Sequence, residues 1–539
     1  MKGLMMHTPL TTNYILQYGN RVFPNQKIIT KNPDGSMHSY TYSDMYKRTM
    51  KLANALQSKF GIKKGDRVAT FAWNHYQHLE LYYGIPATGA ICHPLNLRLS
   101  IDQITFIINH AKDKVVFVDA TLLPLFEKVA TNINGVKHFV LLNAPKDIKT
   151  TLPNFIHYEE LIADQSNEFT IAPVDENSAM GMCYTSGTTG NPKGVLYSHR
   201  STYLHAQALT VPNAMNMSSN DTVLLIVPQF HVMAWGFPFS CMISGANMVL
   251  PGPHLNPQAL VSILKETKVT IANGVPTIWM GVYAELKKNP VKLDSFKMLA
   301  VGGSAMPKAL IKGFMDDLKI EVLHAWGMTE TSPLGTASRL QTQHQDLSDE
   351  EKYDILAKQG VEIAGIDVRI MQDDGQVAPR DGKSIGEIEV CGNWVISEYY
   401  KSESDNFTDD GWFKTGDVGF IDTEGFMQIT DRKKDLIKSG GEWISSLALE
   451  NAIMAHPFIT EAAVIAIPDD KWTERPLAVI VSPGTEKPNI DALKHDMLQV
   501  FAKYQIPDVF VFIDEVPKTS VGKFDKKKLR KMYAEGALK

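Results

Sequence analysis

The sequence predicts an α/β protein with a large N-terminal domain of two helix-covered, mostly parallel sheets, a small β-rich subdomain and a mobile C-terminal α+β domain. Apolar runs of strand length alternate with helical patterns up to about residue 330, and such alternation is typical of parallel sheets covered by helices. After about residue 360, short strands separated by glycines follow instead. We therefore expect a large domain over residues 1–430, with its β-rich subdomain at 360–430, and a small domain over residues 431–539.

The first predicted helices carry recognisable start signals. Ser43 and Asp44 precede a helix whose apolar residues keep helical spacing until Gly61. Ser100 begins a second helix over residues 101–108. Apolar runs predict strands at residues 67–72, 115–118, 139–142, 222–227, 248–250 and 269–272.

The C-terminal third has a different pattern. Short strands are expected at residues 368–371, 386–390 and 426–430, and later at 462–467 and 477–481. The charged stretch at residues 431–435 separates the two groups. A hinge is expected at a junction of this kind.

Bulk composition limits the class of protein. A chain of 539 residues is too long for one hydrophobic core. The net charge of −5 gives no indication of a nucleic-acid partner. The four cysteines (Cys92, Cys183, Cys241 and Cys391) lack metal-binding spacing and indicate a reducing compartment. Because the N-terminus lacks a signal-peptide pattern and no apolar run reaches membrane-spanning length, we expect a cytoplasmic protein without a transmembrane segment.

Residues 184–195 have the composition of a phosphate-binding loop. Three glycines allow tight turns that direct backbone N–H groups into one concavity, and Ser/Thr hydroxyls add donors. Lys193 adds a positive charge. The stretch is not a Walker A loop, because Pro192 precedes the lysine where that motif has glycine. The alternative is a mobile Gly/Ser/Thr surface loop.

Further motifs follow in a fixed order. They are the Phe-His-x-x-x-Trp stretch at 228–235, Gly-Gly-Ser-Ala at 302–305, Trp-Gly-x-Thr-Glu at 326–330, Gly-Trp-Phe-Lys-Thr-Gly-Asp at 411–417, Asp-Arg at 431–432 and the Gly-Lys motif at 518–523. Together with the phosphate loop, they resemble the adenylate-forming superfamily of acyl-CoA synthetases, luciferases and adenylation domains over nearly the whole chain. The stretches at 228–235 and 439–446 look most like medium- and long-chain fatty acid–CoA ligases.

The resemblance implies an ATP-dependent fatty acid–CoA ligase. A carboxylate is a poor electrophile, so its oxygen first attacks the α-phosphate of ATP and releases pyrophosphate. The thiol of coenzyme A then displaces AMP. The implied cofactors are ATP, Mg²⁺ and coenzyme A, and the implied partners are small molecules. Similar synthetases are often homodimers through the large domain, so a homodimer is an expectation here.

The resemblance also assigns roles to individual residues. Those for the phosphates are Thr185, Ser186, Gly187, Thr188, Thr189, Gly190 and Lys193. Those for the adenine pocket are Gly303, Ser304, Ala305 and Trp326, and those for the ribose are Asp417 and Arg432. Further expected nucleotide-binding residues are Gly327, Met328, Thr329, which stands beside Glu330, and Lys438. Glu330 and Thr185 are expected to bind Mg²⁺. Lys523 is expected at the reacting phosphate, His231 near the carboxylate, Trp235 at the mouth of the acyl tunnel and Asp431 at the hinge.

Two positions depart from the superfamily pattern. Trp326 occupies a place where tyrosine is common, so stacking on adenine is kept and a hydroxyl is lost. Ser446 stands where the wider superfamily usually has proline, although fatty acyl synthetases vary there.

Each role has a plainer alternative. Lys523 could be a solvated lysine of a basic tail, and Glu330 could cap a helix. Asp417 could be an ordinary turn residue. His231 and Trp235 could belong to the core.

Other functions also remain open. One is a CoA ligase for a short or sulfur-containing carboxylate, and another is an acyl-AMP ligase that loads a carrier protein. A luciferase-like oxygenase and a non-enzymatic AMP-binding protein are more distant alternatives.

Overall fold

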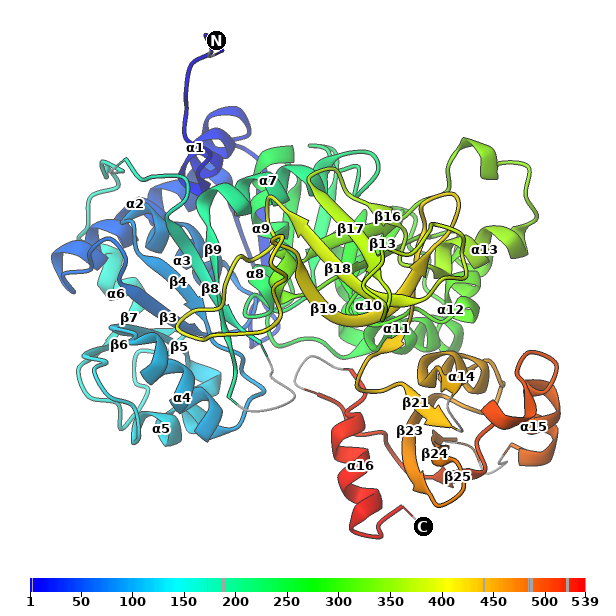
Figure 1. Cartoon of the computed structure of the whole chain (residues 1–539). Coiled ribbons are helices and arrows are strands. Elements are labelled where there is room, and N and C mark those ends of the chain that lie inside the picture. Colours follow the sequence, from blue (N-terminus) through cyan, green and yellow to red (C-terminus); the bar gives the residue numbers. More distant parts are fainter. Residues whose placement is uncertain are drawn as a thin grey trace.

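The computed structural model describes residues 1, 3–171, 173–185, 191–439, 442–482, 484, 488–519 and 523–538, with only the backbone of Glu442 (Figure 1). The described residues form sheets of nine, seven, five and four strands. Two of them are large and mostly parallel, one is small and antiparallel, and one lies in a C-terminal α+β unit. The predicted fold class is thereby confirmed.

The seven-stranded sheet has the order β7-β6-β5-β3-β4-β8-β9. Its strands are β3 (Arg67–Phe71), β4 (Ile91–Pro94), β5 (Val115–Asp119), β6 (His138–Leu142), β7 (Phe155–His157), β8 (Ala179–Tyr184) and β9 (Gly194–Ser198). All neighbours are parallel except β8 and β9. Helices α4 (Ile101–Ala111) and α5 (Leu123–Ala130) cover one face, where Ile104 and Phe126 share a core cluster with Val116.

The nine-stranded sheet has the order β16-β15-β14-β13-β12-β10-β11-β1-β2. Its parallel strands are β1 (Lys27–Lys31), β10 (Thr222–Leu225), β11 (Asn247–Leu250), β12 (Ile271–Gly274), β13 (Met298–Val301) and β14 (Glu321–Gly327). Antiparallel edges are added by β2 (Met37–Thr41), β15 (Leu334–Ser338) and β16 (Val361–Glu362).

Helices fill the space between the two large sheets and cover their outer faces. One core cluster joins Val68 of β3 and Leu225 of β10 through Tyr82 and Phe239. The remaining helices of the large part are α1 (Thr12–Val22), α2 (Tyr42–Ser58), α3 (Tyr76–Ala87), α6 (Tyr158–Ala163), α7 (His199–Thr210), α8 (Val232–Trp235), α9 (Phe237–Ser244), α10 (Pro257–Glu266), α11 (Pro276–Lys288), α12 (Lys308–Lys312) and α13 (Asp349–Ala357).

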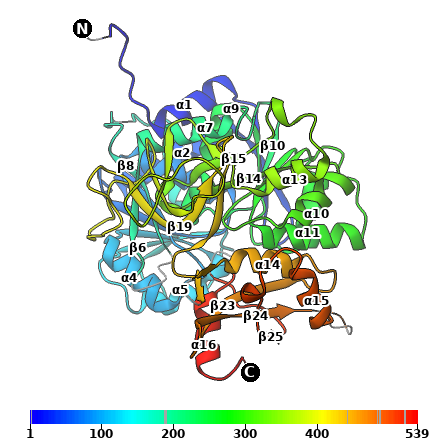
Figure 2. The ribbon, with the colours of Figure 1, turned by 45° about the vertical axis from the view of Figure 1, so that its right-hand side comes forward.

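The four-stranded antiparallel sheet consists of β17 (Ile366–Met371), β18 (Gly386–Gly392), β19 (Phe413–Ile421) and β20 (Met427–Arg432). Beyond it lie β21 (Ile437–Ser439), β22 (Glu442–Ile444), β23 (Glu461–Asp469), β24 (Thr473–Val481), β25 (Val509–Phe512), α14 (Ser446–Met454), α15 (Ile490–Met497) and α16 (Lys526–Ala534). Figures 1 and 2 both show this C-terminal unit, in orange and red, below the rest of the molecule.

Several element boundaries differ from the sequence expectation by a few residues, among them those of the first long helix, of β12 and of the last strand of the four-stranded sheet. The first long helix begins at Tyr42, because Thr41 and Asp44 form a capping box in which each side chain accepts the other's backbone N–H. The strand expected at 269–272 is shifted to β12. Asp431 lies within the last strand of the four-stranded sheet rather than after it.

None of the described helices combines the length and the apolar character needed to cross a bilayer.

Candidate active site

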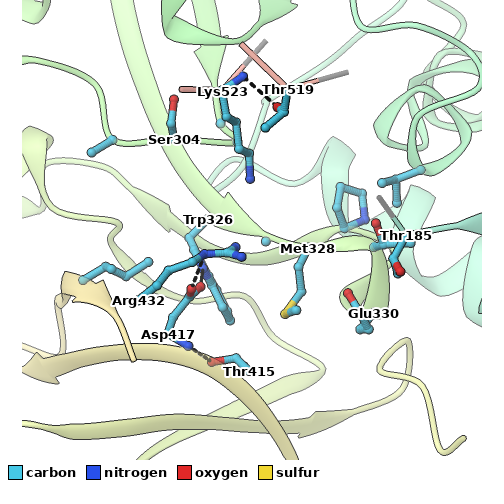
Figure 3. Close-up of a pocket in the computed structure, with 18 of the residues that line it drawn as sticks. Thr185, Ser304, Trp326, Met328, Glu330, Thr415, Asp417, Arg432, Thr519 and Lys523 are labelled. Carbon is cyan, nitrogen blue, oxygen red and sulfur yellow. Dashed lines mark hydrogen bonds and ion pairs between the residues drawn. The ribbon is translucent and has the colours of Figure 1, made fainter. Parts of the chain in front are cut away.

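A cavity of about 570 Å³ lies where the nine-stranded sheet, the four-stranded sheet and the C-terminal unit meet (Figure 3). It opens at the carboxyl ends of β13 and β14, where ligands of parallel sheets commonly bind. The predicted residues that line it are Thr185, Lys193, His231, Trp235, Gly303, Ser304, Ala305, Trp326, Gly327, Met328, Thr329, Glu330, Asp417, Asp431, Arg432 and Lys523. Segments more than 300 residues apart in the chain thus contribute to one pocket.

The described residues that line the cavity do not include the other predicted nucleotide-binding residues. Ser186, Gly187, Thr188, Thr189 and Gly190 lie outside the described residues. Lys438 is exposed on β21, where its Nζ lies 5.4 Å from the ring centroid of Trp443, and it does not line the cavity.

Trp326, Asp417 and Arg432, which are expected at the adenine and ribose, form a hydrogen-bonded group that lines the pocket. The indole Nε1 of Trp326 donates to Oδ2 of Asp417 over 2.9 Å, and Nε of Arg432 lies 3.1 Å from Oδ1 of the same carboxylate. The Asp417 charge is the largest cause that raises the pKa of Arg432. The N–H of Trp326 therefore helps to orient the Asp417 carboxylate.

Glu330 faces the pocket from a turn at Thr329–Thr331, directly after β14. Its Oε1 accepts a 2.7 Å hydrogen bond from the Tyr399 hydroxyl, and burial raises the pKa of the Glu330 carboxyl. Glu330 forms no ion pair with any described residue. A buried carboxylate of this kind fits a bound cation, which would compensate its charge.

Lys193 and Thr185 lie at the two ends of the phosphate loop. Backbone N–H of Thr185 donates to the Lys193 carbonyl over 2.9 Å, which closes the base of the loop. The Lys193 ammonium lies 4.6 Å from the ring centroid of Tyr399 and donates to Oγ of Ser404 over 3.2 Å.

Lys523 reaches the pocket from the C-terminal unit. Its Cε lies 3.7 Å from the position that a Cβ on Gly303 would occupy, so the lysine side chain packs at contact distance against the backbone at Gly303. Burial, together with the positive charge of Arg432, lowers the pKa of Lys523 to about 8. The amine is therefore closer to neutrality than an ordinary surface lysine.

His231 is a neutral imidazole at the pocket wall. Burial, together with the positive charges of Lys523 and Arg98, lowers the pKa of His231 to about 3. It can exchange hydrogen bonds with a carboxylate, but it does not supply a charge at neutral pH.

Trp235 ends an unusual left-handed turn. Val232, Met233, Ala234 and Trp235 have φ values of 46°, 52°, 54° and 55°, and Gly236 continues at 74°. Each non-glycine residue in this conformation costs roughly 1–2 kcal/mol. The turn places the indole of Trp235 against the backbone at Gly302, where a Cβ would lie 3.1 Å from it.

The segment that leads into the turn is held by a buried amide side chain, that of Asn74, from the loop after β3. The Asn74 side chain donates to the carbonyls of Leu225 and Val227 at 2.8 Å and accepts the N–H of Gln229 at 2.7 Å. The segment before the turn is therefore fixed, and the strain is concentrated at residues 232–235.

One wall of the cavity is apolar. It is lined by Leu209, Met215, Val232, Trp235, Phe237, Pro333 and Leu334. These side chains come from the end of α7 and the loop after it, the left-handed turn, the start of α9, and β15 with the residue before it. The cavity therefore joins a polar, charge-lined part to an apolar part.

Sequence reasoning did not identify Tyr399, Asn406, Leu209 or Met215 as pocket residues. Tyr399 and Asn406 lie in the loop between β18 and β19, before the Gly-Trp-Phe-Lys-Thr-Gly-Asp motif. The only available signal was a pair of adjacent tyrosines, Tyr399 and Tyr400, which has no specific chemical meaning.

Comparison with known protein families identifies both parts of the chain. Residues 16–400 match the family described as AMP-binding enzyme, and residues 448–523 match the AMP-binding enzyme C-terminal domain.

Three relatives match almost the whole chain. A medium-chain-fatty-acid–CoA ligase of Ectopseudomonas oleovorans is 43% identical and covers 99% of this chain and 98% of its own. A 3-methylmercaptopropionyl-CoA ligase of Ruegeria lacuscaerulensis is 42% identical and covers 99% of both chains. A long-chain-fatty-acid–CoA ligase of Thermus thermophilus is 42% identical and covers 98% of this chain and 96% of its own.

A solved structure shares the fold. The anthranilate CoA ligase AuaEII in complex with anthranoyl-AMP superposes with a TM-score of 0.88, at 24% identity and full coverage of both chains. Together, the family matches and the full-length relatives show that the chain belongs to the AMP-binding enzyme family and is an acid–thiol ligase that forms an acyl-adenylate from ATP and then an acyl-CoA.

Proposed function

We propose that the enzyme activates a medium- or long-chain fatty acid and transfers it to coenzyme A. The observation that carries this proposal is the single cavity in which a polar wall with Lys193, Glu330 and Lys523 continues into an apolar wall with Trp235 and Leu334. A carboxylate bound at the junction would have ATP on one side and its hydrocarbon chain on the other.

In the first half-reaction, a carboxylate oxygen attacks the α-phosphate and the bond to pyrophosphate breaks. Catalysis then consists mainly of positioning and charge stabilisation. Lys523 is proposed to neutralise charge at the α-phosphate, while Lys193 holds the outer phosphates. Asp417, held by Trp326 and Arg432, is proposed to accept the ribose hydroxyls.

Glu330 and Thr185 are the residues proposed to hold Mg²⁺. When bound, this ion would neutralise part of the triphosphate charge and orient it for in-line displacement. The buried Glu330 carboxylate, without an ion-pair partner among the described residues, supports this assignment.

In the second half-reaction, the thiol of coenzyme A loses its proton, its sulfur bonds to the acyl carbon, and the bond from that carbon to the AMP oxygen breaks. In this structure, Lys523 lines the pocket. A thiol that reaches the acyl carbon needs part of the same space. We infer that the C-terminal unit, residues 431–539, turns about Asp431 to admit the thiol.

The strongest second candidate is a ligase for a short sulfur-containing carboxylate. The Ruegeria relative, named for 3-methylmercaptopropionyl-CoA formation, is as similar to this chain as the Thermus long-chain enzyme. Loading of a carrier protein is a third candidate, which a requirement for coenzyme A would argue against.

A substrate screen separates these candidates. Pyrophosphate release is measured with acetate, butyrate, octanoate, palmitate and 3-(methylthio)propionate, with and without coenzyme A. Because each buried methylene contributes about 0.8 kcal/mol, kcat/KM should rise about fourfold per methylene until the apolar wall is filled. Preference for 3-(methylthio)propionate or acetate over octanoate would contradict the fatty-acid proposal while leaving the ligase chemistry intact.

We propose a cytoplasmic homodimer: the oligomeric state is an expectation from the resemblance, and the location is an expectation from the cysteine pattern and the N-terminal sequence. Light scattering coupled to size-exclusion chromatography measures the first, and a mass of one chain would exclude it.

A further inference from the structure

The loop between β18 and β19, residues 393–412, connects two functional segments of the pocket. On one side, Ile396 N–H donates to the Glu330 carbonyl over 2.9 Å, and the Ser332 hydroxyl donates to the Trp394 carbonyl over 2.8 Å. On the other side, Tyr400 N–H donates to the carbonyl of Gly194, the residue after Lys193, over 2.8 Å. The loop therefore joins the turn that carries Glu330 to the exit of the phosphate loop.

Tyr399 lies in this loop and contacts both charged side chains. Its hydroxyl donates to Oε1 of Glu330 over 2.7 Å, and its ring centroid lies 4.6 Å from the Lys193 ammonium. The side chain is buried and lines the cavity. One ring thus separates an anion at its hydroxyl end from a cation at its face.

This placement matters because opposite charges in a partly dry pocket attract one another strongly. A direct ion pair between Lys193 and Glu330 would neutralise both groups and leave neither free for a ligand. In the described part of the chain, neither of them forms an ion pair. Instead, Glu330 accepts a hydrogen bond from the Tyr399 hydroxyl. Lys193 donates one to Oγ of Ser404 and is further positioned by its cation–π contact with the Tyr399 ring.

We propose that Tyr399 is a positioning residue that holds Glu330 and Lys193 apart and aims them at a divalent cation–nucleoside triphosphate complex. This inference rests on the proposed function of Glu330 and Lys193. The new element is that the relative placement of Glu330 and Lys193 depends on Tyr399. This residue lies in the loop between β18 and β19, outside the motifs that contain the two charged residues.

Two substitutions separate the contacts. Tyr399→Phe removes the hydrogen bond to Glu330 and keeps the ring under Lys193. Tyr399→Leu removes both contacts. Tyr400→Phe is the matched control, because Tyr400 stacks edge-on against His110 and its side chain does not line the cavity.

The test measures binding of α,β-methylene ATP to the full-length enzyme by calorimetry, first in EDTA and then with Mg²⁺. For Tyr399→Phe, metal-free affinity should stay within about twofold of wild type because the cation–π contact is retained. The gain in affinity on adding Mg²⁺ should fall about tenfold, as expected for losing a hydrogen bond to a charged group. Tyr399→Leu should weaken metal-free binding as well, and Tyr400→Phe should match wild type.

A double substitution excludes a purely structural role. If Tyr399 acts on the metal through Glu330, Tyr399→Phe should have little further effect on Mg²⁺-dependent binding in a Glu330→Gln background. Unchanged Mg²⁺ stimulation in Tyr399→Phe, or fully additive losses in the double variant, would overturn the proposal. Because no carboxylic acid is present in this assay, failure of the fatty-acid assignment would leave its result unaffected.

Discussion

At the scale of single residues, burial controls the charge of the groups that face the pocket. It raises the pKa of Glu330, lowers that of Lys523 to about 8 and lowers that of His231 to about 3. All three shifts favour the neutral form, because charged groups lose solvation when buried. Without a ligand, these buried groups therefore have too little charge of the opposite sign around them. A polyanion with its bound metal ion would supply that charge.

The pKa of Lys523 predicts an alkaline limit for adenylation. The ammonium form is needed to neutralise the α-phosphate, and it is lost as the pH rises through about 8. The kcat/KM for pyrophosphate release reports the free enzyme, so it should be flat below this pH and fall above it. In Lys523→Arg the decline should disappear, because arginine stays protonated. If the decline persists in this variant, another group causes it.

The same residue allows the half-reactions to be separated. Lys523→Ala should nearly abolish acyl-adenylate formation, whereas thioester formation from supplied acyl-adenylate should continue. Equal loss of both would show that the lysine has a structural role.

Trp326 gives a second test at this scale. Trp326→Phe keeps an aromatic face for adenine and removes the N–H that donates to Asp417. Since Arg432 still contacts that carboxylate, we expect the KM for ATP to rise about three- to tenfold, which is less than the full loss expected for a hydrogen bond to a charged group. An unchanged KM would mean that Arg432 alone orients Asp417.

At the scale of elements, the left-handed turn decides where the indole of Trp235 lies. Trp235→Ala should therefore change the chain-length profile of kcat/KM and leave the KM for ATP nearly unchanged. The profile is measured over the carboxylate series of the substrate screen. Loss of ATP binding or of cooperative unfolding in this variant would instead assign Trp235 to the nucleotide pocket or the core.

How far an element could be predicted depended on whether its cause is local. The capped helix at Ser100 and the strand at 115–118 were found because capping and apolar runs act over a few residues. The turn at 232–235 contains no glycine before Gly236, so nothing in Val-Met-Ala-Trp indicates positive φ. Asn74, which is 151–155 residues away in the sequence, fixes the segment that leads into the turn, and a contact of that range leaves no local sequence signal.

Site residues follow the same rule. Glu330 and Lys523 could be proposed because each stands in a dense local motif. Tyr399 could not, because its significance arises only when its loop is bonded to both Glu330 and Gly194. Lys438 has motif context but faces solvent here, so its role in nucleotide binding stays a prediction.

At the scale of the whole molecule, a buried cluster attaches the C-terminal unit to β20. Oδ2 of Asp431 accepts hydrogen bonds from both the N–H and the hydroxyl of Ser446 over 2.6 Å. Lys526 donates to the same hydroxyl over 2.6 Å and pairs with Glu450 over 2.7 Å. Proline, which the superfamily usually has at this position, offers neither donor, so the anchorage of Asp431 here depends on serine.

This cluster gives a test of the hinge. Ser446 is the first residue of α14, where proline is well tolerated, so Ser446→Pro should leave the helix intact while removing both donors to Asp431. Release of this anchor should slow adenylation more than thioester formation from supplied acyl-adenylate, because it loosens the arrangement in which Lys523 lines the pocket. Ser446→Ala keeps the N–H and should have a smaller effect. Equal slowing of both half-reactions by Ser446→Pro would place the pivot elsewhere.

The left-handed turn at residues 232–235 also has a kinetic consequence. A left-handed backbone cannot change gradually into a right-handed or extended one, because the intermediate φ values near zero are sterically forbidden. Any movement of Trp235 that releases the turn must therefore carry several residues together across a barrier, between two discrete states. Entry of an acyl chain should accordingly proceed in two steps, with a tryptophan fluorescence change whose rate reaches a plateau as the fatty acid concentration rises. The speed of substrate entry would then depend on the handedness of four peptide units as well as on the width of the tunnel.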